Sequence, residues 1–356
     1  MKPVPDSTLD KVYVIHENPA WLPPLRAALA ADGTPYEEWM LDGGSFDFTE
    51  PPPHGVFYNR ISASAHTRGH DFAPEYTASV LAWLTAHGRR VVNNGRALEL
   101  EVSKVKQYAA LGAFGVRTPR TLVAVGRAAV RAAARDFGAP LILKPNRGGK
   151  GAGVRLFNSL AALDAFLDGP EYDAGRDGTM LIQQYVVPAD GAIIRCEFVG
   201  GRFLYAVRVD ASGGFELCPA DACRIEDRVC PVGEKGPVGA AGAAGETGDG
   251  AAQEHTDPQF RILENFTHPN LDRFAAFLAA NGIEIAGIEM IIDAEGVAWT
   301  YDVNTNTNYN AEAEQAAGLA GTPRAGMRAV ARFLAAERAR LRHAAPQARM
   351  APPAAE

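Results

Sequence analysis

The chain has 356 residues, 47% of them apolar and 22% charged, which is the composition of a globular protein with a sizeable core. At roughly 100–200 residues per domain, this length allows two or three lobes. The net charge of −7 argues against a general nucleic-acid-binding protein. Neither a signal peptide nor the roughly 20 consecutive apolar residues of a membrane helix is present, so we expect a cytoplasmic protein without a membrane partner.

Strands and helices alternate through residues 1–100. Apolar runs predict strands at residues 11–16, Gly55–Asn59 and Arg90–Asn93, and apolar periodicity predicts helices at Leu22–Ala31 and Glu75–His87. This alternation predicts an N-terminal α/β lobe with a largely parallel sheet.

Residues 101–186 have a different pattern, which predicts a second and smaller lobe. The helices expected here are Glu101–Leu111, Arg127–Phe137 and Leu160–Leu167, and the strands are Leu141–Lys144, Val154–Phe157 and Met180–Val186. A glycine-rich loop joins the first two of these strands.

A third lobe is expected over residues 187–343, with hairpins at Ile193–Val209 and Gly287–Asn304 and a helix at Leu271–Ala280. Glycine recurs every third residue between Gly236 and Gly248, but so short a repeat cannot form a collagen helix. We interpret residues 231–256 as a flexible surface insertion and residues 344–356 as a disordered tail.

The cysteines are Cys196, Cys218, Cys223 and Cys230. The last three have four and six residues between them, which matches no paired C-x-x-C zinc site. Reduced thiols are therefore the interpretation that we adopt.

The loop after Leu141–Lys144 favours phosphate binding. Glycines at 148, 149, 151 and 153 let the backbone approach an anion closely, and Lys144, Arg147 and Lys150 add positive charge. Because the loop lies between two strands and lacks a Ser or Thr after a Gly-Lys pair, it is not a P-loop. The alternative is a plain hairpin turn.

The hairpin Gly287–Asn304 could hold a metal ion. Alternation places Asp302 and Asn304 on one face, and a turn that pairs Ile292 with Val297 puts Glu289 on the same side as Thr300 and Asp302. Oxygen ligands of this kind suit magnesium bound to a nucleotide. The alternative is a solvated polar face.

Gly200-Gly201 predicts a two-residue turn in the other hairpin. The implied register pairs Arg195 with Ala206 and Ile193 with Arg208, so that the two arginines share one face. Such a pair suits an anionic substrate or a developing acyl phosphate, and the alternative is salt bridging to carboxylates such as Glu197.

The order of these elements resembles the ATP-grasp superfamily, above all its ribosomal-protein glutamate ligases and other α-L-glutamate ligase-like proteins, from about Val56 to about Arg332. The resemblance implies an ATP-grasp fold of the α/β class, with an N-terminal parallel-sheet lobe, a small lid lobe and a C-terminal antiparallel-sheet lobe. It also implies ATP as a substrate and Mg²⁺ as the metal, with Mn²⁺ as an alternative.

Site residues follow from the same resemblance, position by position. The residues that would contact the nucleotide are Lys104, Lys144, Gly148, Gly149, Lys150, Gly151, Gly153, Gln183, Gln184, Tyr185 and Val186. The metal ligands would be Glu289, Asp302 and Asn304, and the catalytic contacts to substrate or phosphoryl group would be Arg195 and Arg208. We also expect substrate contacts at Arg60, Asn93 and Asn306, the first two because they lie at predicted strand ends.

Several positions depart from the family pattern. Ser103 replaces an acidic residue before the first lysine, Gln184 replaces a glutamate, and Ile193 stands where an acidic residue often occurs. Asp302 is shorter than the usual glutamate, and residues 305–310 replace a proline-glycine turn. These changes affect the amine substrate more than the phosphoryl chemistry.

The resemblance implies a ligase that joins a small-molecule carboxylate and an amine, either of which could belong to a peptide, through an acyl phosphate. The alternatives are a kinase with the same fold and a non-catalytic nucleotide-binding protein. We expect no nucleic-acid partner, and a homo-oligomer is compatible with the sequence.

Overall fold

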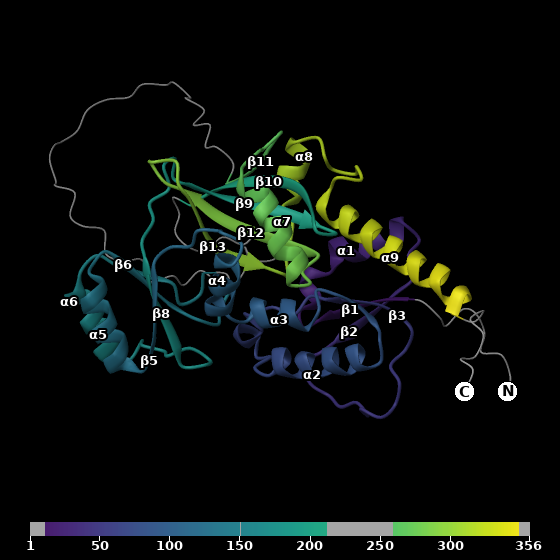
Figure 1. The fold of residues 1–356 in the computed structure, drawn as a ribbon, viewed down its shortest axis with the longest axis horizontal. Helices are drawn as coiled ribbons and strands as arrows, with labels where there is room; N and C mark the ends of the chain where they lie inside the picture. The colour runs from purple at the N-terminus through teal and green to yellow at the C-terminus, as the bar shows by residue number, and fades with distance from the viewer. Residues whose placement is uncertain (1–10, 150, 212–258, 349–356) are drawn as a thin grey trace, which may run out of the picture.

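Three sheets organise the part of the chain that the computed structural model describes, namely residues 11–149, 151–211 and 259–348. Figure 1 shows one sheet at each end of the molecule and the third between them. The predicted insertion 231–256, three of the four cysteines, Lys150 and residues 349–356 of the predicted tail lie outside the described residues. The expected α/β class is confirmed, with a parallel N-terminal sheet and an antiparallel C-terminal sheet, and the lid sheet is antiparallel as well.

The N-terminal sheet is parallel and has the strand order β2-β1-β3-β4. Its central strands are buried on both faces, as parallel strands covered by helices must be. One face packs on α1 and α9, and the other on α2 and α3. The elements of this lobe are β1 (Lys11–His16), η2 (Pro19–Trp21), α1 (Pro23–Ala31), β2 (Tyr36–Met40), β3 (Gly55–Asn59), η3 (Ala65–Arg68), α2 (Ala73–Ala86), β4 (Arg90–Val92) and α3 (Gly95–Glu101).

The lid lobe contains an antiparallel sheet with the order β5-β8-β6-β7. Alternation along β6 explains its two faces, because Leu141 and Leu143 pack on α5 and α6 while Ile142 and Lys144 point the other way, into a pocket. The elements of the lid are β5 (Thr121–Val125), α5 (Arg127–Phe137), β6 (Leu141–Pro145), β7 (Arg155–Phe157), α6 (Leu160–Asp168) and β8 (Thr179–Gln184). The preceding helix α4 (Lys104–Gly112) packs on the central sheet rather than on the lid.

The central sheet is antiparallel, with the order β11-β10-β9-β12-β13. One face packs on α7 together with residues of α3 and α4, and the buried Cys196 belongs to this core. The opposite face lines the pocket. The elements are β9 (Ala192–Val199), β10 (Arg202–Asp210), β11 (Phe260–Leu263), α7 (Asn270–Ala280), β12 (Ile285–Ile292), β13 (Ala298–Asn304), α8 (Ala311–Ala316) and α9 (Gly326–Ala348).

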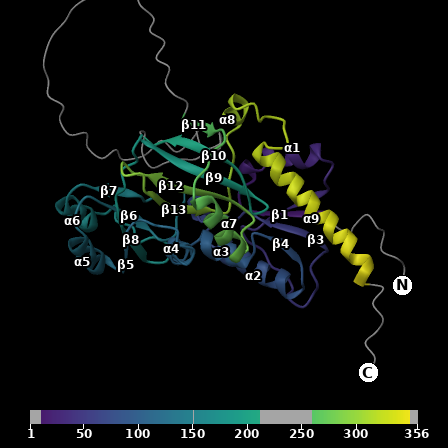
Figure 2. The ribbon, with the colours of Figure 1, turned by 45° about the horizontal axis from the view of Figure 1, so that its top comes forward.

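The last helix, α9, returns to the first lobe. Met327, Val330 and Leu334 pack against α1 and the parallel sheet, and Figures 1 and 2 both place α9 beside α1, at the end remote from α5 and α6. Chain ends that are distant in sequence therefore share one core. No helix of the described residues combines the length and apolarity needed to cross a membrane.

Truncating a buried residue of α9 should destabilise the N-terminal lobe. Leu334 is fully buried, so Leu334→Ala leaves a cavity and should lower the free energy of unfolding by about 2–5 kcal/mol. Urea denaturation measures the change. Arg332→Ala, at an exposed position of the same helix, is the matched control and should shift stability by less than about 0.5 kcal/mol. Equal stability of the two variants would contradict the packing role of α9.

Candidate active site

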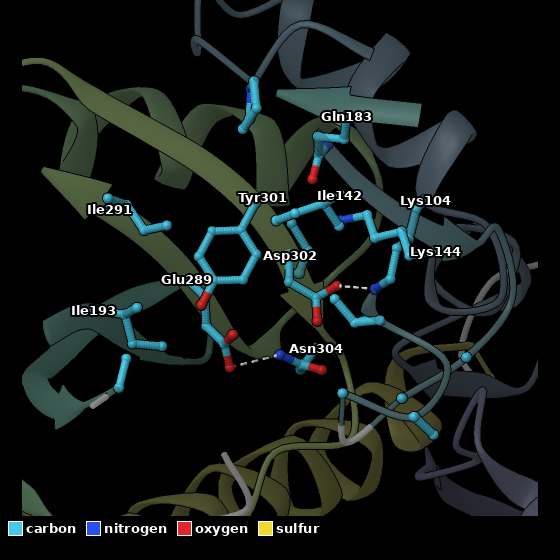
Figure 3. Close-up of a pocket in the computed structure, with 18 of the residues that line it drawn as sticks. Lys104, Ile142, Lys144, Gln183, Ile193, Glu289, Ile291, Tyr301, Asp302 and Asn304 are labelled. Atoms are coloured by element: carbon cyan, nitrogen blue, oxygen red, sulfur yellow. Dashed lines mark hydrogen bonds and ion pairs between the residues drawn. The ribbon is translucent and has the colours of Figure 1, made fainter. Parts of the chain in front are cut away.

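One deep pocket of about 550 Å³ lies where the three lobes meet, within the usual size range for ligand sites. We call it the central pocket, and Figure 3 shows its interior. The lid sheet and glycine loop form one wall, the central sheet forms another, and residues after β1 and β3 close one end. The predicted site residues that line it are Lys104, Lys144, Gly148, Gly149, Gly151, Gln183, Gln184, Tyr185, Val186, Arg195, Glu289, Asp302, Asn304 and Asn306.

The glycine loop covers the pocket and reaches the N-terminal lobe. A Cβ atom at Gly149 would lie 3.2 Å from the Cβ atom of Ser64, so only glycine permits this approach without displacement. Gly153 has φ +76° and lies against Pro145, outside the pocket lining. We expected Arg147 to add positive charge to the pocket, but it does not line the pocket, and its guanidinium pairs with Glu75 of α2.

Lys144 projects from β6 into the pocket and is almost fully buried. Its Nζ atom donates to the Tyr108 hydroxyl at 2.7 Å, and the Gln183 amide donates to the same hydroxyl at 3.1 Å. Tyr108 thus holds a buried cation in place without neutralising it. Such a cation can bind an anionic group such as phosphate.

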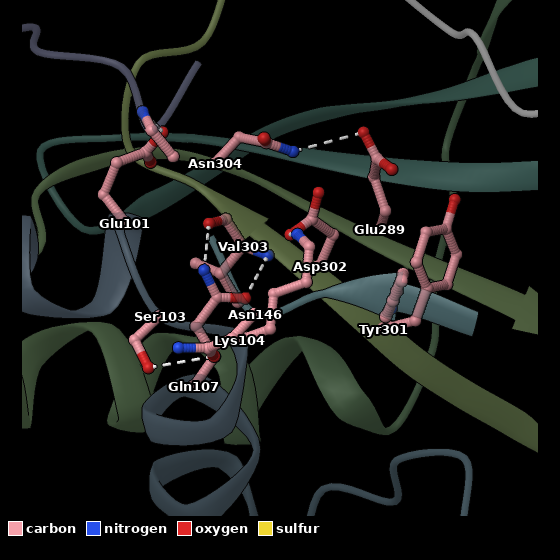
Figure 4. Close-up of polar contacts among 12 residues, drawn as sticks. Glu101, Ser103, Lys104, Gln107, Asn146, Glu289, Tyr301, Asp302, Val303 and Asn304 are labelled. Carbon is pink, nitrogen blue, oxygen red and sulfur yellow. Dashed lines mark hydrogen bonds and ion pairs between the residues drawn. The ribbon is translucent and has the colours of Figure 1, made fainter. Parts of the chain in front are cut away.

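Lys104 begins α4 and pairs with Asp302, with 2.6 Å between Nζ and Oδ1 (Figures 3 and 4). Ser103 caps the helix and bonds to Asn146, which connects α4 to the end of β6. Burial alone would lower the pKa of the Lys104 ammonium, but the attraction and hydrogen bond of Asp302, together with the nearby Tyr108 and Glu101, raise that pKa. Lys104 also lowers the pKa of Asp302 despite that residue's burial. Both groups are therefore charged at neutral pH.

Glu289 and Asp302 lie on the same face of the β12–β13 hairpin, as expected, but they pair directly with each other, which the expected register did not predict. Ile292 pairs with Ala298 rather than Val297, and an irregularity after Glu289 adds one residue to β13. Thr300 consequently pairs with Met290 and is fully buried, so the prediction that it shares the face of Glu289 was wrong. The bulge instead brings Tyr301 into the pocket beside Asp302.

Three oxygen donors of this hairpin fit a hard cation. Asn304 Nδ2 donates a hydrogen bond to Glu289 Oε1 at 3.2 Å. The nitrogen of the Asn304 amide therefore faces Glu289, and its oxygen is the end that can bind a cation. Two carboxylates and one neutral oxygen, completed by phosphate oxygens and water, match the preference of Mg²⁺. No cluster of three His, Cys, Asp or Glu side chains suited to a metal occurs among the described residues, so the set depends on Asn304.

Arg195 lies at the centre of a buried ionic network. Its guanidinium donates to Glu197 at 2.6 Å, to Glu289 at 2.7 Å and to the Thr307 hydroxyl at 2.7 Å, and that hydroxyl donates to Glu197 at 2.8 Å. Burial raises the pKa of Glu289, and Arg195 counteracts this by favouring the carboxylate. Arg195 therefore positions Glu289 and also lines the pocket.

Arg208 does not stand beside Arg195, so that prediction was wrong. The Gly200-Gly201 turn pairs Arg202 with Val199 as expected, but a bulge between Phe203 and Tyr205 shifts the register. Arg195 then pairs with Val207, and Arg208 lies on the opposite face of the sheet, where it bonds to Asp190 at 3.0 Å. A bulge of one residue reverses the face of every later side chain.

The predicted substrate residues have three different positions. Asn306 lines the pocket. Asn93 is fully buried and its side chain makes four hydrogen bonds to the backbone of the central sheet and the residues beside it, so the expectation that it contacts substrate was wrong. Arg60 lies behind the pocket wall, where it holds Asn306 and Asn308.

Sequence reasoning missed the apolar surfaces of the pocket. Ile142 on the lid faces the cavity, as do Ile193, Ile291 and Tyr301 on the central sheet (Figure 3). An apolar slot of this kind can hold a planar base. The signal was present for Ile142, because strand alternation places it on the face of Lys144.

Comparisons with known proteins agree with this geometry. Residues 102–216 match the family model described as the RimK-like ATP-grasp domain. A probable alpha-L-glutamate ligase of Teredinibacter turnerae is 30% identical over 140 residues, which cover 39% of this chain and 46% of that protein. One from Vibrio vulnificus is 29% identical over 166 residues, which cover 46% and 52%. The chain thus spans about half the length of the curated relatives it matches.

Solved structures match over nearly the whole chain. A RimK domain protein ATP-grasp from Sphaerobacter thermophilus has a TM-score of 0.57 at 18% identity, covering 91% of this chain and 98% of that one. D-cycloserine synthetase has a TM-score of 0.57 at 17% identity, covering 93% and 99%. The ATP-grasp ligase PsnB, complexed with a minimal precursor, has a TM-score of 0.58 at 15% identity, covering 92% and 100%. At these identities the likeness establishes the fold.

Proposed function

We propose that this chain, whose residues 102–216 match the RimK-like ATP-grasp domain and whose fold is similar to that of ATP-grasp structures, is an ATP-dependent carboxylate–amine ligase. One substrate is an amino acid such as glutamate, in line with the names of its relatives, and a peptide is an alternative suggested by structural neighbours that hold precursor peptides. The observation that carries the proposal is that Lys104, Lys144, the glycine loop and the Glu289–Asp302–Asn304 set all line one pocket.

The reaction that we propose has two steps. A substrate carboxylate oxygen attacks the γ-phosphorus of ATP, the bond to the bridging oxygen breaks, and ADP leaves. An amine nitrogen then attacks the carbonyl of the acyl phosphate, phosphate departs, and the nitrogen loses a proton to give the amide. Phosphoryl transfer of this type depends mainly on positioning and charge neutralisation.

In this proposed reaction, each wall of the pocket contributes groups that bind the nucleotide or position the ligands of the metal. Lys104 and Lys144 hold phosphate oxygens, while the backbone of the glycine loop covers the γ-phosphate and keeps water from the acyl phosphate. Glu289, Asp302 and Asn304 would hold Mg²⁺, which when bound neutralises phosphate charge. Arg195 favours the ionised form of Glu289 and holds its carboxylate in place.

A screen for ADP release tests the proposal. Purified protein with ATP and Mg²⁺ is combined with pairs of carboxylates and amines, including glutamate and glutamate-containing peptides, and products are identified by mass spectrometry. We expect one pair to give ADP, free phosphate and an amide in equal amounts. A stable phosphoester would make the protein a kinase, and nucleotide binding without turnover for any pair would leave a binding protein.

A further inference from the structure

Arg60 is a buried cation without a carboxylate partner in the described part of the chain. The residue comes directly after β3, beside the end of β1. Between β1 and β3 the chain changes the direction in which it adds strands to the parallel sheet, and ligands usually bind at such a point. The residue is 2% exposed, and its hydrogen-bond acceptors are Asn306 Oδ1 at 3.2 Å, Thr307 O at 3.2 Å and Asn308 Oδ1 at 2.8 Å. Its Nη1 atom is buried and has no partner. Buried charges normally have a counter-charge, so this one attracts anions.

The contacts of Arg60 also fix the orientation of two asparagines. A guanidinium can only donate hydrogen bonds, so the side-chain atoms of Asn306 and Asn308 that face Arg60 must be their oxygens. The opposite ends of these amides are NH₂ groups, which donate. Both residues line the central pocket, so this wall offers hydrogen-bond donors to a ligand.

Asn304, two residues earlier, has the reverse orientation. A carboxylate only accepts, so the atom of Asn304 that bonds to Glu289 must be its nitrogen, and the oxygen is the free end. Alternate residues of one segment therefore present an oxygen at 304 and amide hydrogens at 306 and 308. Asn304 therefore offers the pocket an oxygen that suits a cation, whereas Asn306 and Asn308 offer donors that suit an anion. The Glu101 carboxylate also lines the pocket, but it already accepts hydrogen bonds from the Ala63 N–H group and from the N–H group and hydroxyl of Thr305.

We propose that the wall formed by Asn306 and Asn308 binds a carboxylate of the substrate, one that remains free during the reaction. The two amide groups donate to its oxygens, and Arg60, one hydrogen bond behind them, supplies the positive charge. Ser62 and Ser64 line the same end, with hydroxyls 2.9 Å apart. This inference rests on the proposed ligase function and narrows its substrate to a molecule with a second carboxylate.

Asparagine-to-aspartate substitutions test the inference sharply. In Asn306→Asp and Asn308→Asp an oxygen still accepts from Arg60, so the fold should be kept and the melting temperature should stay equal or rise. The pocket end, however, changes from a donor to a negatively charged acceptor, which repels a carboxylate. Asn310→Asp is the matched control, because Asn310 caps α8 away from the pocket lining and aspartate caps equally well.

Calorimetry measures the binding of small carboxylate probes to the protein, with and without Mg²⁺ and the non-hydrolysable ATP analogue AMP-PNP. The probes are L-glutamate, L-glutamine, L-isoglutamine and the dipeptide Gly-Glu. Glutamine and isoglutamine each lack one of the two carboxylates of glutamate, and Gly-Glu tests whether the carboxylate can belong to a peptide. We expect at least one carboxylate probe to bind, and Asn306→Asp and Asn308→Asp to weaken its binding by about ten- to a hundredfold. The control should stay within about twofold.

Unchanged probe affinity in Asn306→Asp and Asn308→Asp, or failure of every carboxylate probe to bind the unmodified protein, would overturn the inference. Amide formation by the unmodified protein, followed in the ADP-release assay, tests the ligase function separately. If the protein forms an amide but both substitutions leave the probe affinity unchanged, only the carboxylate site is refuted. A protein that binds the probes selectively but makes no amide refutes the ligase function and supports the site.

Discussion

Asp302→Asn is expected to lower the rate of ADP release by at least about 10²–10³-fold, which is the usual cost of losing one preorganised electrostatic contact. Asp302 pairs with Lys104 in a nearly closed part of the pocket, where the side chains are 19% and 11% exposed. The amide keeps the shape of the side chain but removes its charge, so the metal set loses one of its two carboxylates and Lys104 loses its anionic partner. We also expect the Mg²⁺ concentration for half-maximal rate to rise.

The control for Asp302→Asn lies on the same hairpin. Glu295→Gln removes an equal charge from the exposed turn between β12 and β13 and should leave the ADP-release rate unchanged. Circular dichroism and the melting temperature show whether each variant folds. A folded Asp302→Asn protein with a rate within about threefold of the original and an unaltered Mg²⁺ dependence would refute the role of Asp302 as a metal ligand.

The polar face of the β12–β13 hairpin was predictable because it rests on local pattern. Glu289 and Asp302 occur in strands whose other residues are largely apolar. Alternation placed them on one face even though the expected register at this pair was two residues out, one at the turn and one at the bulge. Lys144 was identified in another way, from the glycine-rich loop that follows its strand, and it lies opposite the core residues of β6. Local sequence patterns thus identified ionic residues of both pocket walls.

Bulges were not predictable from the same pattern. The Gly200-Gly201 turn set the first pairs of its hairpin correctly, yet the extra residue before Tyr205 moved Arg208 to the other face. Nothing in the residue types marks that position, because the bulge is selected by packing on both faces of the sheet. A register derived from a turn is therefore secure only for the first few pairs.

Contacts between the lobes could not be predicted from the sequence either. Asn93 has φ +57° and joins β4 to the central sheet, a role that depends on residues almost 200 positions later. β2 and β5 were missed because most of their residues are half-buried or exposed and show no clear apolar alternation. α9 was missed because alanines and arginines interrupt its apolar stripe, although its buried residues recur at helical spacing.

Arg195→Met is expected to lower the free energy of unfolding by about 3–5 kcal/mol, as breaking a buried ionic network does when partners are left unpaired. Glu197 and Glu289 are 2% and 7% exposed, so without the guanidinium two carboxylates remain buried close together. Urea denaturation gives the change in stability. Arg202→Met, at an exposed position of the same hairpin, is the control and should have little effect.

A double-mutant cycle separates the network from the loss of one side chain. Glu197→Gln removes one of the two charges that Arg195 balances, so Arg195→Met should cost less in the Glu197→Gln background than in the original protein. Residues that act independently would give additive changes, and additivity here would refute the network. Arg195 also holds Glu289, one of the expected metal ligands. If the same pair of substitutions is non-additive in the rate of ADP release as well as in stability, then the network that stabilises the central sheet also sets the geometry of the metal ligands.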